Sequence, residues 1–168
     1  MDLQVVRVSV PILGAVCIAA SKYGVLRVHL GDELPRFERE LATAFPAAVL
    51  HGPGPVTRAA ARAILAYLSG GPDPKVETVL PEEGFASRVW REIGRIPRGE
   101  TRSYARIAKA IRSPAAFRAV GQACGKNPVP LLIPCHRVIA ADGRLGGFSS
   151  DLAFKRKLLA LEGVALPE

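Results

Sequence analysis

The stretch SYARIAKAIRSPAAFRAVGQACGK (residues 103–126) contains two apolar stripes with helical spacing on either side of a short break. In the break, Ser113 and Pro114 predict the N-cap and the first position of a second helix. The stripes are Tyr104, Ile107, Ala108 and Ile111, then Phe117, Val120, Gly121 and Cys124. Two helices joined by a tight turn predict a helix-turn-helix, which can lie in a groove of DNA but is also common in proteins that bind no nucleic acid.

The sequence before this stretch predicts a small sheet with helices. Three apolar segments separated by turns have the composition of strands, and the second turn offers Gly24 for a backbone with positive φ. Two amphipathic segments predict helices, and the second begins at Thr57, a candidate N-cap, and ends at Gly70. The expected strands cover residues 3–10, 14–21, 24–30 and 74–80, and the expected helices cover residues 34–45 and 57–70.

A domain boundary is expected near residue 82, where proline, glycine and acidic residues accumulate. Residues 1–82 would form an α/β supporting domain, and residues 83–168 a mainly α domain that begins with a helix near Phe85. The fold class is therefore α+β. The sequence has no apolar run of membrane-spanning length and no secretory signal at its N-terminus, so we expect a cytoplasmic protein with no membrane partner.

The net charge of +8 comes entirely from the second half of the chain. Residues 1–82 hold eight basic and eight acidic side chains, whereas residues 83–168 hold fifteen basic and seven acidic ones. A one-sided basic excess indicates a polyanionic partner, of which nucleic acid is the commonest. Fourteen Pro with a single Asn and a single Met also favour a thermophilic source.

The three cysteines, Cys17, Cys124 and Cys135, are too few and too scattered for a disulfide framework, so free thiols are expected. They lack the paired spacing of zinc ligands, and we expect neither a metal nor a cofactor. Cys135 differs from the other two because His136 follows it. A thiol with a free pKa of about 8.5 needs a base to ionise at neutral pH.

Neighbouring side chains on an extended segment point to opposite faces, so a water molecule would link Cys135 to His136. Glu162, in the last turn of an amphipathic C-terminal helix, is the candidate for orienting the imidazole. Spacing alone leaves open whether Cys135 is a nucleophile or a small buried apolar residue.

The blocks around these residues resemble the signature of the O6-alkylguanine-DNA alkyltransferases, which are suicidal DNA-repair proteins. The matching blocks are IPRGETRSYARIA, FRAVGQACGKNP, NPVPLLIPCHRVIAADGRLGGFS and KRKLLALEG, in register over residues 85–163. The resemblance implies a ribonuclease H-like N-terminal domain and a monomer that acts on double-stranded DNA containing O6-alkylguanine. Such a protein flips the damaged nucleotide out of the duplex and transfers the alkyl group irreversibly to its own cysteine.

The resemblance also implies a role for each matching residue. Cys135 would accept the alkyl group, His136 would act through water and Glu162 to remove its proton, and Asn127 would hold the surrounding segment in place. Arg118 would fill the gap left by the flipped base, and the small Ala119 would lie against the minor groove. The substrate-binding residues implied are Tyr104, Val138, Ser149 and Lys155. Gln122 and Lys126 lie on the same exposed side of the second helix or just beyond it and are expected to contact DNA.

Three other functions fit parts of the sequence. A lesion-recognition protein without repair activity would share the C-terminal domain but would lack the acceptor thiol that Cys135 provides. A cysteine hydrolase built on Cys135, His136 and Glu162 would release more product than there is protein. A transcription regulator using the helix-turn-helix alone would prefer one DNA sequence to a damaged base and would commonly be a dimer.

Overall fold

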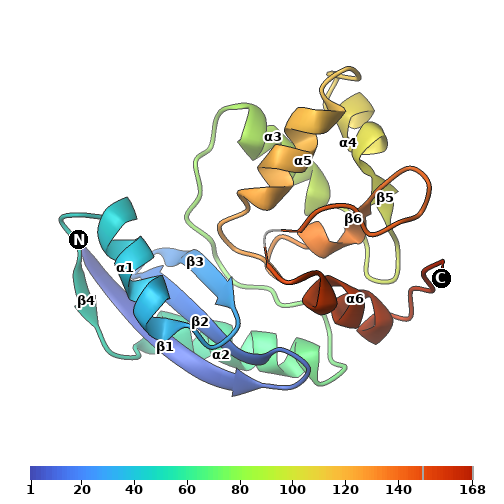
Figure 1. Cartoon of the computed structure of the whole chain (residues 1–168). Helices are drawn as coiled ribbons and strands as arrows, with labels where there is room; N and C mark the ends of the chain where they lie inside the picture. The colour runs from blue at the N-terminus through green and yellow to red at the C-terminus, as the bar shows by residue number, and fades with distance from the viewer. Residues whose placement is uncertain (149, 168) are drawn as a thin grey trace. The chain divides into compact units, whose positions relative to one another are not determined.

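The computed structural model describes residues 1–148 and 150–167, and it divides the chain into two compact units, Met1–Val79 and Leu80–Glu168 (Figure 1). The first unit combines a sheet with two helices, and the second is mainly helical. The fold class is α+β. Within the described residues, no helix is both long enough and apolar enough to cross a membrane.

The first unit is a four-stranded sheet in the order β3-β2-β1-β4. Its elements are β1 (Asp2–Val10), β2 (Gly14–Ser21), β3 (Gly24–Leu30), α1 (Leu34–Ala44), β4 (Val49–His51) and α2 (Pro55–Leu68). Strands β1, β2 and β3 are antiparallel neighbours, and β4 pairs with β1 in parallel.

Helices α1 and α2 cover opposite faces of this sheet. Phe37 and Leu41 of α1 pack against Cys17, Ala19 and other residues of the sheet that point to the same side. Helix α2 packs against β1, β2 and β3. Because successive strand residues point to opposite faces, two covered faces explain why β2 is buried at every position after its first.

Strands β1 to β3 lie where the sequence predicts them, but two expectations for this unit are wrong and one strand was not expected. Helix α2 begins at Pro55 and is capped by Gly54, so Thr57 is its third residue, with its Oγ1 accepting from the Gly54 N–H at 3.0 Å. Residues 74–80 form no strand and make a single bridge, from Thr78 to Val25. Strand β4 was not expected, because its three residues are all exposed and carry no alternating pattern.

The second unit contains α3 (Phe85–Ile93), β5 (Arg102–Ser103), α4 (Tyr104–Ala110), α5 (Phe117–Gly125), the 3-10 turn η1 (Cys135–Arg137), β6 (Val138–Ile139) and α6 (Leu152–Leu161). Helices α3, α4 and α5 pack against one another, as Figure 1 shows. The indole N–H of Trp90 in α3 donates to the Ala123 carbonyl of α5 at 2.8 Å, which fixes these two helices at a polar as well as an apolar contact.

The predicted cap of α5 is wrong. Ser113 and Pro114 lie in a turn, and α5 begins three residues after Pro114, at Phe117. Hydrogen bonds within this connection, including Ser113 N–H to the Ala108 carbonyl at 2.9 Å, satisfy donors that a helix start would leave open. The later start also leaves Phe117 45% exposed, although the apolar stripe predicted it to be in the core.

Candidate active site

The segment before Cys135 is held by the side chain of Asn127. The Asn127 Nδ2 donates to the Ile133 carbonyl at 2.8 Å, and its Oδ1 accepts from the Val129 N–H at 3.0 Å. Proline residues in this segment have no N–H to contribute to a strand ladder, and the Asn127 side chain instead makes local hydrogen bonds to the backbone. The expectation of an extended conformation at Cys135 is therefore wrong, because Cys135 opens the 3-10 turn η1 and strand β6 starts only at Val138.

The Cys135 thiol is buried, with 2% of the residue exposed. Burial raises its pKa, while the hydrogen bond from the Asn127 side chain and the nearby charge of Lys155 act in the opposite direction. Burial dominates, so the resting thiol keeps its proton and needs a base before it can react.

His136 is a buried base held by a carboxylate. Its Nε2 lies 2.9 Å from Oε1 of Glu162, and the residue is 1% exposed. Burial lowers the pKa of His136 more than the Glu162 carboxylate raises it, so the imidazole is neutral at neutral pH. A carboxylate can only accept, which places the proton on Nε2 and the basic lone pair on Nδ1.

Arg137 shares the same carboxylate and was missed by the sequence reasoning. Its Nη2 lies 2.7 Å from Oε1 of Glu162 and its Nε 3.0 Å from Oε2, while Nη1 donates to the Ile96 carbonyl at 2.8 Å. Arg137 is 2% exposed. The signal was an arginine inside an apolar run, because a buried arginine needs an anionic partner. The arginine fixes the Glu162 carboxylate in position next to His136.

Lys155 and Tyr104 meet at the loop that precedes α6. The fully buried Lys155 donates through Nζ to the carbonyls of Val138 at 2.6 Å and Gly147 at 3.0 Å. The Tyr104 hydroxyl donates to the same Gly147 carbonyl at 3.2 Å. A β-carbon at Gly146, where φ is +68°, would lie 2.8 Å from that hydroxyl, so this approach requires glycine.

Burial favours the neutral form of both side chains and shifts their pKa values accordingly. It raises the pKa of Tyr104 to about 12, so the hydroxyl stays a donor at neutral pH. It lowers the pKa of Lys155 to about 8. The site thus contains a hydroxyl that stays a donor and an ammonium group whose pKa of about 8 is close to neutral pH, both near the cysteine.

The buried ammonium predicts a pH-dependent stability. The pKa of Lys155 is about 8 in the fold and 10.5 ordinarily, so between these values the unfolded chain binds more protons. Lys155 therefore contributes a rise of up to about 3 kcal/mol in the free energy of unfolding between pH 8 and pH 10.5. The buried thiols and the Tyr104 hydroxyl, whose pKa values burial raises, contribute a fall over the same range. Chemical denaturation at several pH values measures this slope. Lys155→Met should make the slope less positive than in wild type, because only the fall from the buried thiols and Tyr104 remains. Lys157→Met, at an exposed position on the same helix, should leave the wild-type slope unchanged; equal slopes in all three proteins would contradict the assignment.

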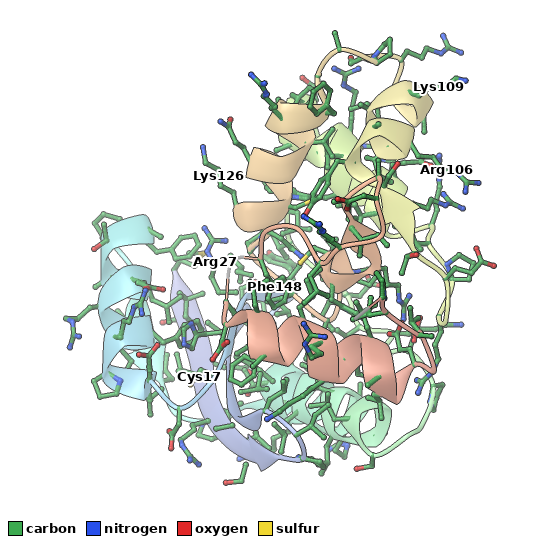
Figure 2. The ribbon with its side chains drawn as sticks, turned by 45° about the vertical axis from the view of Figure 1, so that its right-hand side comes forward. Cys17, Arg27, Arg106, Lys109, Lys126 and Phe148 are labelled. Atoms are coloured by element: carbon green, nitrogen blue, oxygen red, sulfur yellow. The ribbon has the colours of Figure 1, made fainter. Side chains whose placement is uncertain are left out.

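The predicted DNA-binding residues lie on α5 or directly after it. Arg118, Gln122 and Lys126 are exposed, and Ala119 is half-buried. Further cations outside the predicted set extend from α4, and Figure 2 shows Arg106 and Lys109 pointing away from the ribbon. The structure thus presents a basic surface on the two-helix element. Ser149, predicted to bind substrate, lies outside the described residues.

The second unit places a buried cysteine, Cys135, directly before a histidine that is paired with a buried carboxylate. Cys17, Cys124 and Cys135 are all buried free thiols. In residues 1–148 and 150–167, no three His, Cys, Asp or Glu side chains gather into a group that could hold a metal ion.

Comparison with known proteins identifies the family. The family model for the 6-O-methylguanine DNA methyltransferase, DNA binding domain, matches residues 84–164. The methylated-DNA--protein-cysteine methyltransferase of Methanosarcina barkeri is 47% identical over 106 residues, which cover 62% of this chain and 67% of that protein. The protein of the same name from Mycolicibacterium paratuberculosis is 52% identical over 87 residues, which cover 52% of this chain and 53% of that protein. The match therefore spans between about half and two thirds of these relatives.

The structural similarity extends over nearly the whole chain. Mycobacterium tuberculosis OGT in complex with DNA is similar with a TM-score of 0.79 and 32% identity, covering 96% of this chain and 92% of that one. The chain belongs to the 6-O-methylguanine DNA methyltransferase family.

Proposed function

We propose that this protein repairs O6-alkylguanine in double-stranded DNA by transferring the alkyl group irreversibly to Cys135. The observation that carries the proposal is a buried thiol next to a neutral His136 that Glu162 and Arg137 hold in place. The names of the relatives, and the solved complex of one of them with DNA, support the same activity.

The chemistry follows from the charge states of the site. His136 takes the Cys135 proton through a bridging water, and the resulting imidazolium is stabilised by the Glu162 carboxylate. The thiolate attacks the alkyl carbon, so a sulfur–carbon bond forms, the bond from that carbon to guanine O6 breaks, and the electron pair moves onto the base. Tyr104 keeps its proton because burial raises its pKa to about 12, and its hydroxyl exchanges the Gly147 carbonyl for the departing guanine as the acceptor of its hydrogen bond.

The product is a thioether at Cys135. It has no activated carbonyl for water to attack, so the thiol is not regenerated and each chain acts once. A cysteine hydrolase, by contrast, passes through a thioester and turns over.

We further propose that α4 and α5 act as a helix-turn-helix that binds the duplex. A buried thiol cannot reach a base inside the helix, so the nucleotide must be extruded at a cost of a few kcal/mol. Arg118 offsets this cost by filling the gap, while Ala119 lies against the minor groove, and Gln122 and Lys126 contact the strand. Val138, Ser149 and Lys155 complete the pocket for the base, and Asn127 keeps the cysteine segment in position.

The remaining assignments concern the whole protein. We propose that the first unit is a ribonuclease H-like supporting domain and that the second carries both DNA binding and the reactive cysteine. The basic excess of the second half supports that division. The protein acts as a cytoplasmic monomer without a cofactor.

The direct test is to incubate the protein with a duplex carrying one O6-methylguanine, digest it with trypsin and weigh the peptides. Cleavage after Arg118, Lys126 and Arg137 separates Cys124 from Cys135. We expect one methyl group on the peptide 127–137, saturating at one per chain. Tight binding to the damaged duplex without methylation would instead identify a lesion-recognition protein.

A further inference from the structure

Phe117 is an exposed aromatic side chain at the start of α5. It is the first residue of that helix, and it is 45% exposed. The Cζ atom of the neighbouring Arg118 lies 5.9 Å from the centre of its ring. No other aromatic residue among the described part of the second unit is as exposed. Burial in the core therefore does not explain why a phenylalanine stands at this position.

The segment that carries Phe117 is fixed in place. The connection from α4 is closed by hydrogen bonds from Ser113 N–H to the Ala108 carbonyl and from Ala116 N–H to the Ser113 carbonyl, both at 2.9 Å. The Arg88 guanidinium also donates to the Ile111 carbonyl at 3.2 Å. Because helical side chains lean toward the N-terminus, the ring extends beyond the end of α5 rather than back along the helix.

We propose that Phe117 is a positioning residue that stacks on the base pair next to the gap filled by Arg118, which makes it part of the base-extrusion device. This inference rests on the proposed function, because it takes α5 to be the helix that meets the minor groove. Proteins that bind there often insert apolar side chains at a base step and unstack it. Stacking a base on an aromatic ring strengthens binding by about tenfold or more.

Because Phe117 and Arg118 are neighbours, both can act at the same step of base extrusion, each in a different way. Arg118 replaces the extruded base inside the helix, and Phe117 covers the face of the neighbouring base pair that extrusion exposes. The contact between guanidinium and ring at 5.9 Å already holds the two groups together before DNA binds.

The test compares single-turnover alkyl transfer to Cys135 on three substrates: a duplex containing O6-methylguanine, the same strand without its complement, and free O6-benzylguanine. Phe117→Ala should lower the rate on the duplex by about tenfold at limiting protein. It should change the rates on the single strand and on the free base by less than about twofold, because neither requires a base pair to be opened. Phe117→Trp should retain the duplex rate, and Phe117→Leu should lose most of it.

Two control variants give the smallest and the largest change in transfer rate against which Phe117→Ala is compared. Tyr23→Ala removes another exposed ring with a cation beside it, Lys22 at 5.0 Å, but in the first unit, and should have no effect on any substrate. Arg118→Ala should reduce the duplex rate at least as much as Phe117→Ala does, again with little effect on the free base.

Any of the following outcomes would contradict the stacking role of Phe117. Equal losses on all three substrates would make Phe117 a structural residue, and a duplex rate no lower than that of Tyr23→Ala would make it irrelevant. A fully active Phe117→Leu would show that the aromatic ring is not used. If wild-type protein transferred nothing to Cys135 even from the free base, the proposed function itself would fail, and this result is distinct from a loss confined to Phe117 variants.

Discussion

Replacing Cys135 with serine should abolish alkyl transfer while duplex binding stays within a few-fold of wild type. Serine is close in size to cysteine, so the 3-10 turn η1 and the hydrogen bonds of Asn127 should persist. A hydroxyl is a far weaker nucleophile than a thiolate and stays protonated at neutral pH. Mass spectrometry of the tryptic peptides measures the transfer, and titration of a labelled duplex at fixed salt measures the binding.

Cys124→Ser is the matched control. Burial raises the pKa of the Cys124 thiol to about 12, and the residue is 6% exposed on the core side of α5. This variant should therefore transfer the alkyl group at close to the wild-type rate. Methylation of the peptide 119–126 in the Cys135→Ser protein would show that Cys124 is the acceptor and would refute the assignment.

The pattern of apolar residues was sufficient to predict most helices and strands. Strands β1, β2 and β3 follow from runs of β-branched and small apolar residues separated by glycine-containing turns. Helix α3 follows from the four-residue spacing that starts at Phe85. Each of these elements packs one or both of its faces into the core, so the spacing of its apolar residues follows from which side chains are buried.

The features that the pattern did not predict depend on particular hydrogen bonds, either between distant residues or within a turn. Helix α2 begins before Thr57 because Pro55 suits the first position and the side chain of Gln4 accepts from the Val56 N–H at 3.1 Å, from a strand more than fifty residues away. The early start expected for α5 failed because the turn after α4 uses its own donors. The spacing of apolar residues encodes neither kind of hydrogen bond.

Contacts between residues far apart in the sequence also decide how much of the site could be predicted. The pairing of His136 with Glu162 was expected from the C-terminal helix that carries Glu162, and the family resemblance links the same two residues. Arg137 was overlooked because a basic residue next to a reactive histidine looks like part of a solvated surface until the return of α6 buries it. The apolar run around Arg137 indicates a buried arginine, but only the fold shows that Glu162 is its partner.

The ion pair of Arg137 and Glu162 should make a large contribution to stability that can be separated from its part in the chemistry. Both side chains are almost fully buried, at 3% and 0% exposure. Arg137→Met would remove the guanidinium from the buried Glu162 carboxylate. Breaking a buried pair on one side typically costs about 3–5 kcal/mol, and we expect the free energy of unfolding in urea to fall by that amount. The exposed pair Arg36 and Glu40 provides the control, since Arg36→Met should cost about 1 kcal/mol or less.

The double variant Arg137→Met with Glu162→Leu distinguishes the two roles. An apolar pair of similar volume avoids the desolvation of both charges, so much of the lost stability should return. Alkyl transfer should not return, because His136 would lose the carboxylate that fixes its tautomer and stabilises its charged form, a loss of about 10²-fold or more in a general base. A double variant with restored stability and wild-type transfer would mean that His136 needs no carboxylate. One that was as unstable as Arg137→Met would mean that packing around α6, rather than the buried charge, explains the single variant.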